Sequence, residues 1–141
     1  MREHLVNLAL KLVGCPYIWG GQNPWAGLDC SGFIIWIYQV FGLLPSGDWT
    51  AQGLVKALPS TEKLLVTELK PGDLVFYGEG SRHLSHVMLY AGGNLVVGAS
   101  GGGPLTTTRE EAAKKGAMVK VKPSGYRSDF VGYVRVEFPG E

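Results

Sequence analysis

The sequence predicts an α+β fold with an antiparallel sheet. Helical patterns occupy the first half of the chain, and strand patterns joined by short turns occupy the second half. The regular strand–helix alternation of a parallel sheet is missing. The chain has 141 residues, of which 45% are hydrophobic and 18% are charged, which is enough for one domain with its own core. We therefore expect residues 1–141 to form a single domain.

Two helices are predicted in the first third of the chain. The first is indicated by apolar residues at the spacing of one helix face, namely Leu5, Leu8, Ala9 and Leu12. Gly14 and Pro16 end this helix. The second is indicated by the apolar run 33–41, which starts just after Cys30 and stops at Gly42.

Two shorter helices are predicted from their first residues. Thr50 is a side-chain N-cap for a helix near Thr50–Leu58. Thr108 and Glu111 have the spacing of a capping box, and Gly116 ends the short helix that follows. Both predictions depend on hydroxyl groups that accept hydrogen bonds from free backbone N–H groups.

The predicted strands are bounded by turns rich in glycine, proline and asparagine. Residues 70–73 (Lys-Pro-Gly-Asp) have the order of a type II turn, and residues 92–94 (Gly-Gly-Asn) separate the arms of a hairpin. In chain order, the predicted strands cover residues 73–77, 85–91, 95–99, 118–122 and 130–137.

The stretch Asp29-Cys30-Ser31 places a thiol between two polar side chains at the start of the second helix. Free N–H groups and the positive end of the helix dipole favour a thiolate there, which makes Cys30 a candidate nucleophile. Two alternatives stay open. Cys30 could be a small buried side chain, or it could form a disulfide with Cys15, the other cysteine of the chain.

A thiol nucleophile needs a base, and His86 is the best candidate among three histidines. His4 lies off the apolar face of the first helix and His83 lies in a Gly/Ser-rich loop, so we expect both to be solvated. His86 opens a predicted strand, whose rigid end can hold an imidazole against a thiol. Such an imidazole accepts the thiol proton and later protonates the leaving amine. The alternative is an ordinary hydrogen-bonded polar residue.

Several other classes of protein are disfavoured. A net charge of +1 argues against a nucleic-acid partner. The cysteines and histidines lack metal-ligand spacing, and the glycine runs at 20–21 and 101–103 lack the pattern of a phosphate-binding loop. No apolar run approaches the roughly 20 residues that span a bilayer. We expect no metal, no cofactor and no membrane span.

Five segments resemble the NlpC-type cell-wall cysteine peptidases and occur in the same order. They are residues 16–21 (Pro-Tyr-Ile-Trp-Gly-Gly), 29–33 (Asp-Cys-Ser-Gly-Phe), 42–45 (Gly-Leu-Leu-Pro), 71–76 (Pro-Gly-Asp-Leu-Val-Phe) and 86–90 (His-Val-Met-Leu-Tyr). This resemblance implies a papain-like fold, in which the cysteine helix packs on an antiparallel sheet that carries the histidine. It also implies cleavage of peptidoglycan stem peptides, typically between γ-D-glutamate and the diamino acid.

The resemblance also implies roles for individual residues. Cys30 is the nucleophile and His86 the general base. Tyr17 resembles a family tyrosine that helps to bind the oxyanion, together with the Cys30 backbone N–H. Asp29 and Ser31 match positions that hold the free amine of a stem-peptide L-alanine, although Asp29 is equally a helix cap. Independently of the resemblance, Trp19, Trp25 and Trp49 lie in predicted loops and are candidates for lining a substrate groove.

One position departs from the family pattern. The family usually has a third polar residue, most often histidine, where this chain has Gly98 in Val97-Gly98-Ala99-Ser100. Glycine has no side chain with which to orient an imidazole, so the third group is unassigned. Ser100, Asn94, Gln52, a backbone carbonyl and a water are the alternatives.

The chain carries no wall-binding repeat and no visible export signal, as in stand-alone enzymes that resemble phage lysins. We therefore expect a monomer made in the cytoplasm that acts on the wall after release or as part of a virion. Two other functions stay open. One is a Cys-His amidase or acyltransferase with another acyl substrate, and the other is a non-catalytic virion or wall-binding domain.

Overall fold

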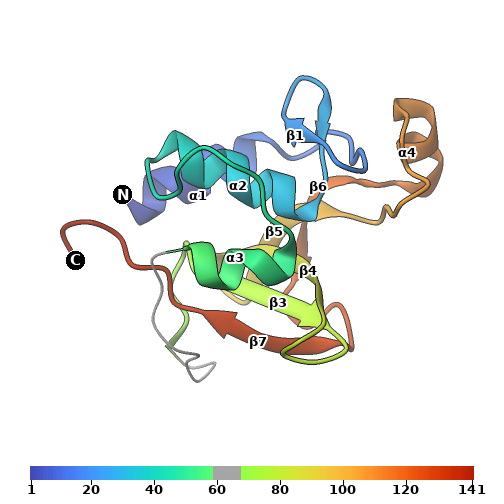
Figure 1. The fold of residues 1–141 in the computed structure, drawn as a ribbon. Helices are drawn as coiled ribbons and strands as arrows, with labels where there is room; N and C mark the ends of the chain where they lie inside the picture. The colour runs from blue at the N-terminus through green and yellow to red at the C-terminus, as the bar shows by residue number, and fades with distance from the viewer. Residues whose placement is uncertain (59–67) are drawn as a thin grey trace.

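A computed structural model of the chain describes residues 1–58 and 68–141. Three helices precede the main sheet: α1 (Arg2–Lys11), α2 (Cys30–Val40) and α3 (Ala51–Ala57) (Figure 1). A fourth, α4 (Arg109–Lys115), connects two of the later strands. The predicted α+β class is confirmed. No helix in the described ranges has the length and apolar character needed to cross a bilayer.

The main sheet has five antiparallel strands in the order β6-β5-β4-β3-β7. Their bounds are β3 (Leu74–Gly78), β4 (Leu84–Gly92), β5 (Leu95–Ser100), β6 (Met118–Pro123) and β7 (Phe130–Val134). The predicted hairpin is β4–β5, with Asn94 at a left-handed φ of 63° in its turn. Strand β4 lies at the centre, so its residues are held by hydrogen bonds on both sides.

The two faces of the sheet are packed differently. Helix α2 lies across β4 and β5, and α1 and α3 flank it, so this face buries mainly aliphatic side chains such as Val87 and Leu89. The opposite face buries a cluster rich in tyrosine: Val75, Tyr77, Met88, Tyr90, Val96 and Tyr133. Side chains alternate along β4, so His86 belongs to the tyrosine face.

The predicted helix starts are confirmed in atomic detail. The Asp29 carboxylate accepts from Gly32 N at 2.7 Å at the start of α2, and the Thr50 hydroxyl accepts from Gly53 N at 3.1 Å. Thr108 caps α4 by accepting from Glu111 N at 3.1 Å. Each cap satisfies one of the N–H groups that a helix start leaves free.

Two segments differ from their predictions. The loop 17–28 contains a two-stranded ribbon, β1 (Gln22–Asn23) and β2 (Gly27–Leu28), which is too short for any sequence period to reveal. The strand predicted over 130–137 ends at Val134. Arg135 and the N–H of Val136 turn instead to the buried carboxylate of Asp73, which the sequence pattern cannot show.

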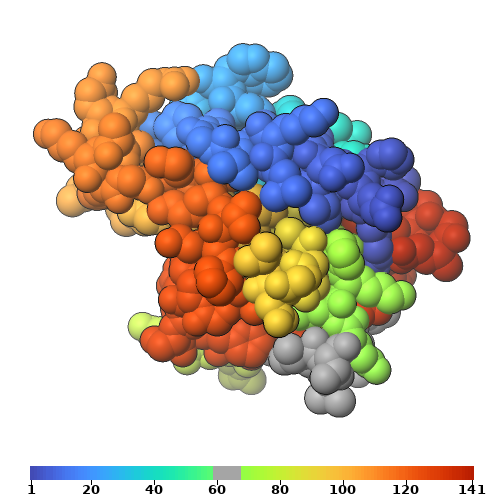
Figure 2. Space-filling model, turned by 180° about the vertical axis from the view of Figure 1, so that it is seen from behind, coloured from blue at the N-terminus to red at the C-terminus, as the bar shows by residue number. Residues whose placement is uncertain are grey.

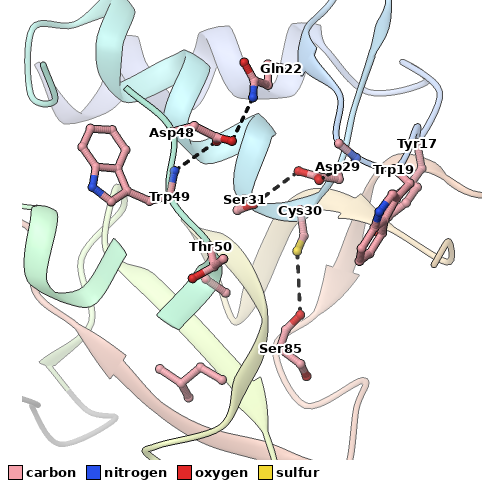
Figure 3. Close-up of a pocket in the computed structure, with 13 residues that line it drawn as sticks. Tyr17, Trp19, Gln22, Asp29, Cys30, Ser31, Asp48, Trp49, Thr50 and Ser85 are labelled. Atoms are coloured by element: carbon pink, nitrogen blue, oxygen red, sulfur yellow. Dashed lines mark hydrogen bonds between the residues drawn. The ribbon is translucent and has the colours of Figure 1, made fainter. Parts of the chain in front are cut away.

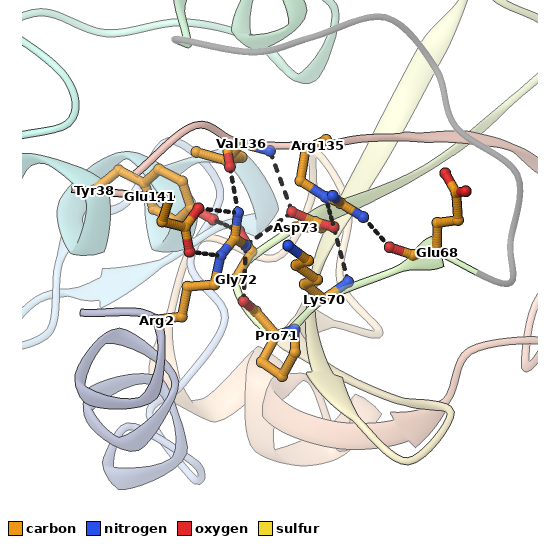
Figure 4. A network of polar contacts seen from close by, with 10 residues as sticks. All are labelled: Arg2, Tyr38, Glu68, Lys70, Pro71, Gly72, Asp73, Arg135, Val136 and Glu141. Carbon is orange, nitrogen blue, oxygen red and sulfur yellow. Dashed lines mark hydrogen bonds and ion pairs between the residues drawn. The ribbon is translucent and has the colours of Figure 1, made fainter. Parts of the chain in front are cut away.

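Asp73 joins both ends of the chain (Figure 4). This fully buried carboxylate pairs with Arg2 of α1 at 2.9 Å and with Arg135 after β7 at 2.6 Å. Arg2 also bonds the side chain of Glu141, and the blue N-terminal helix lies against the red C-terminal segment in Figure 2. This network closes the molecule at the end away from Cys30.

Candidate active site

Cys30 is the first residue of α2, and its thiol lies over the start of β4. The Sγ atom donates to the backbone carbonyl of Ser85 at 3.9 Å, next to His86 in the chain (Figure 3). The two predicted partners, the helix start and the strand start, therefore meet. The disulfide alternative is not realised, because Cys15 and Cys30 are both free thiols.

Asp29 fixes the loop in front of the thiol. One carboxylate oxygen caps α2, and the other accepts from Gly20 N at 3.0 Å. The loop approaches α2 so closely that a Cβ on Gly32 would lie 2.0 Å from Gly21 O. The Gly-Gly loop and the Asp-Cys-Ser-Gly stretch are thus one packed unit, and the capping role expected for Asp29 is confirmed.

The resting state of Cys30 differs from the sequence prediction. Burial, and secondly the negative charge of Asp29, raise the pKa of the Cys30 thiol to about 11. The backbone N–H group of Val87 in β4, followed by those of Ser31 and Cys30 at the helix start, lowers this pKa, but by less. The prediction of a resting thiolate is therefore wrong, and the thiol donating to Ser85 is the neutral form.

His86 is buried, with 5% of its surface exposed. Burial, followed by the positive charge of Arg127, lowers the pKa of His86 to about 3. The site thus holds a neutral thiol beside a neutral imidazole. His4 and His83 are exposed, as predicted.

Among the described residues, the side chain that hydrogen-bonds His86 is Tyr126, which no sequence pattern singles out. The Tyr126 hydroxyl lies 2.8 Å from His86 Nε2 and 3.1 Å from the Ser100 hydroxyl. A side chain at Gly98 would require Met88 to move, because its Cβ would lie 2.7 Å from the Met88 sulfur. Methionine thus fills the space that the usual third residue would use.

Of the other orienting groups considered, Ser100 reaches His86 only through Tyr126. Asn94 lies in the β4–β5 turn, and its backbone N–H donates to the hydroxyl of Tyr90. Gln52 donates to Ser81 O at 3.0 Å and accepts from Leu84 N at 2.8 Å. It therefore holds the loop that leads into His86 and does not contact the ring.

Two cavities meet at Cys30. The larger, about 460 Å³, lies between the Gly-Gly loop and the start of α3, and contains the carboxylates of Asp29 and Asp48. The smaller, about 290 Å³, contains His86, the 101–103 glycines and the guanidinium of Arg127. The larger cavity thus has two carboxylates in its lining, whereas the arginine of the smaller one is paired with Asp129.

The remaining predicted site residues divide into two groups. Tyr17 and Trp19 line both cavities, and Ser31 lines the larger one. Figure 3 shows Tyr17 and Trp19 on one side of Cys30, with Trp49 on the other. Trp25 lines neither cavity and packs edge to face against Trp36 at 6.4 Å, so the structure does not support it as a groove residue.

No sequence pattern singles out Tyr126, Arg127 or Asp48. All three lie in loops without a periodic pattern, and tertiary folding alone brings them to the site. Trp49 lines the larger cavity, as expected for a loop tryptophan. Within residues 1–58 and 68–141, no three His, Cys, Asp or Glu side chains are grouped closely enough to hold a metal ion.

A thiol at a helix start, packed on an antiparallel sheet that carries a histidine, defines the papain-like class of α+β domains. The chain belongs to the NlpC/P60 family, whose model matches residues 14–129. The predicted family membership and fold class are confirmed.

Relatives with names or solved structures extend this assignment. The chain is 39% identical over 94 residues to the bifunctional muramidase/DL-endopeptidase CwlT of Bacillus subtilis. That match covers 64% of this chain and 26% of CwlT, so the chain spans about a quarter of that relative's length.

Two solved structures cover nearly all of the chain. The NlpC/p60 domain of the peptidoglycan hydrolase SagA superimposes with a TM-score of 0.68 at 30% identity, covering 98% of this chain and 99% of that domain. RipD of Mycobacterium tuberculosis, described as a non-catalytic NlpC/p60 protein adapted to peptidoglycan binding, gives 0.67 at 22% identity with 98% of each chain covered. The second match shows the fold alone.

Proposed function

We propose that this protein is a cysteine hydrolase that cleaves peptide bonds in peptidoglycan stem peptides, between γ-D-glutamate and the diamino acid. One observation carries the proposal: Cys30 at the start of α2 and His86 at the start of β4 line the same cavity. The relatives named DL-endopeptidase and peptidoglycan hydrolase support the choice of substrate.

The first half-reaction forms a thioester. The Cys30 Sγ attacks the carbonyl carbon of the scissile bond as the thiol proton passes to His86. The oxyanion accepts hydrogen bonds from the Cys30 backbone N–H and the Tyr17 hydroxyl. When the carbon–nitrogen bond breaks, His86 gives its proton to the leaving amine, and the acyl group stays on sulfur.

The second half-reaction returns the enzyme to its starting state. Water attacks the thioester carbon, His86 accepts a water proton, and the carbon–sulfur bond breaks. The proton then passes to sulfur, which restores the neutral thiol and releases a carboxylic acid. A neutral resting pair suits this cycle, because an imidazolium exists only while the thiol proton is in transit.

The charges of the groove support a substrate with an amine on one side of the scissile bond. Asp29 and Asp48 give the larger cavity its negative charge, and Ser31 adds a hydroxyl. A stem peptide that begins with a free L-alanine amine fits this side. Asp29 would then act twice, as a helix cap and as a counter-ion.

Digestion of purified muropeptides by wild type and Cys30→Ala, read by mass spectrometry, tests this proposal. We expect wild type to break the γ-D-glutamyl–diamino acid bond and Cys30→Ala to lose more than about a thousand-fold in rate. Cys15→Ala is the matched control, since this second free thiol lies outside both cavities and should keep full activity.

Retained cleavage by Cys30→Ala would refute the thiol mechanism. Cleavage at another amide bond would instead identify an amidase with the same chemistry. Wall binding by wild type without any bond cleavage would place the protein with non-catalytic members such as RipD.

A further inference from the structure

We propose that Tyr126 is the positioning residue of His86 and takes over the task of the side chain missing at Gly98. This inference rests on the proposed function, since it concerns the base of the same reaction. It is carried by geometry: Tyr126 is the side chain that hydrogen-bonds the imidazole, at 2.8 Å from Nε2.

We assign His86 the tautomer with its proton on Nε2, one of the two that the hydroxyl chain allows. Tyr126 lies between Nε2 and the Ser100 hydroxyl, which is 3.1 Å away and can accept its proton. With that proton directed at Ser100, the Tyr126 oxygen accepts from Nε2–H. The unprotonated Nδ1 is then left as the base for the Cys30 thiol.

The turn that carries Tyr126 is fastened to the sheet on both sides. The carbonyl of Ser124 accepts from the Tyr77 hydroxyl at 2.8 Å, and its N–H donates to Asn94 O at 2.8 Å. On the other side, Asp129 O accepts from Gly78 N at 2.9 Å. Tyr126 is therefore held rigidly enough to fix an imidazole.

The vacancy at Gly98 and the contact at Tyr126 are complementary. On the tyrosine face, Met88 occupies the space beside Gly98, so a histidine there would require the methionine to move. Tyr126 reaches the same ring from outside the sheet, across the neighbouring edge of Tyr77. The position without a side chain and the hydroxyl of Tyr126 thus concern the same imidazole.

Side chains from α2, β3, β5 and the turn that carries Tyr126 surround His86. Cys30 approaches from α2, Tyr77 from β3, Ser100 from β5, and Arg127 and Asp129 from the same turn as Tyr126. Arg127 pairs with Asp129 at 2.6 Å, so their charges largely oppose each other. A neutral tyrosine can orient the imidazole among these groups without adding another charge.

Tyr126→Phe removes the hydroxyl and keeps the ring, so it separates positioning from packing. We expect kcat on a soluble muropeptide to fall about ten- to a hundred-fold with KM unchanged, because the hydroxyl acts on the base and not on the substrate. Ser100→Ala should give a smaller loss in kcat, since Ser100 is one hydrogen bond further from His86 than Tyr126 is. The melting temperature of Tyr126→Phe should stay close to wild type.

Tyr133→Phe is the matched control. Tyr133 lies on the same face of the sheet, and its buried hydroxyl has no hydrogen-bond partner in the described ranges. The same chemical change there should leave kcat, and the pH profile of kcat, unchanged.

The second measurement does not depend on activity. Nitrogen-15 NMR of the His86 ring should show the Nε2–H tautomer in wild type and a mixture of tautomers in Tyr126→Phe. Unchanged kcat together with an unchanged tautomer in Tyr126→Phe would overturn the role of Tyr126. If wild type cleaves nothing, the proposed function fails, whereas the NMR result still decides whether Tyr126 sets the tautomer.

Discussion

The molecule contains two buried polar networks with opposite chemistry. At one end, the charged Asp73 carboxylate pairs with two arginines that come from opposite ends of the chain, and it also accepts from two backbone N–H groups. At the other, His86, Tyr126 and Ser100 form a chain of neutral groups. Asp73 and His86 are both buried, yet only the first network is organised around a charged side chain.

The difference follows from what each network has to do. Asp73 has four hydrogen-bond donors on its two oxygens, so its charge is compensated and does not need to change. In the proposed reaction, His86 gains and loses a proton in each cycle, and a fixed partner charge would favour one of its two states. A neutral, orienting partner leaves the proton free to move.

The largest expected effect comes from breaking the ionic network with Asp73→Asn. Each oxygen of the Asp73 carboxylate accepts hydrogen bonds from two N–H donors. In the variant, the amide N–H₂ that replaces one oxygen would face two such donors. We expect a loss of about 3 kcal/mol or more in the free energy of unfolding, measured by urea denaturation.

Asp48→Asn is the control for that substitution, because Asp48 is exposed and bonds only Gln22 and its own neighbour Trp49 among the described residues. It should change stability by no more than about 0.5 kcal/mol. A similar small loss for Asp73→Asn would show that the buried network contributes little.

How far the sequence could anticipate each network depends on how local its signals are. Cys30 and His86 were predicted because each lies at the start of an element with a clear pattern, and the family resemblance pairs them. The absence of an orienting side chain at Gly98 could also be predicted. Tyr126 could not, because it lies 40 residues from His86 and reaches it only after five strands have paired.

The same limit explains the error about the thiolate. A helix start is visible in the sequence, and its effect on Cys30 has the predicted direction. Burial by the surrounding loops is a tertiary property, and here it outweighs the helix start. The partners of Asp73 are hidden for the same reason, since Arg2 and Arg135 come from opposite termini.

The second prediction concerns the neutral network and uses pH. The pKa of His86 falls from its ordinary 6.5 to about 3 on folding, so the unfolded chain binds a proton there more readily than the folded one. The contribution of His86 to stability is therefore complete above pH 6.5 and is lost as the pH falls. When the pH is lowered from 7 to 5, we expect protonation of His86 in the unfolded chain to reduce the free energy of unfolding by about 2 kcal/mol.

Denaturation of wild type and His86→Gln at several pH values isolates this effect. His4 and His83 are present in both proteins, so their titration cancels in the difference. The stability of wild type should fall more steeply than that of the variant below pH 6.5. Parallel curves would mean that His86 takes up a proton as easily in the folded state as in the unfolded one.

The smallest expected effect tests an ion pair that borders the neutral network. Arg127 and Asp129 are bidentate, at 2.6 and 2.9 Å, but each side chain is about one-third exposed. Asp129→Asn should therefore cost about 1 kcal/mol or less in unfolding free energy. It should nevertheless lower the pKa of His86 further, because the positive charge of Arg127 would no longer be opposed. NMR titration of His86 in this variant separates the two effects. A raised pKa would contradict the opposing influences of Arg127 and Asp129 on the imidazole.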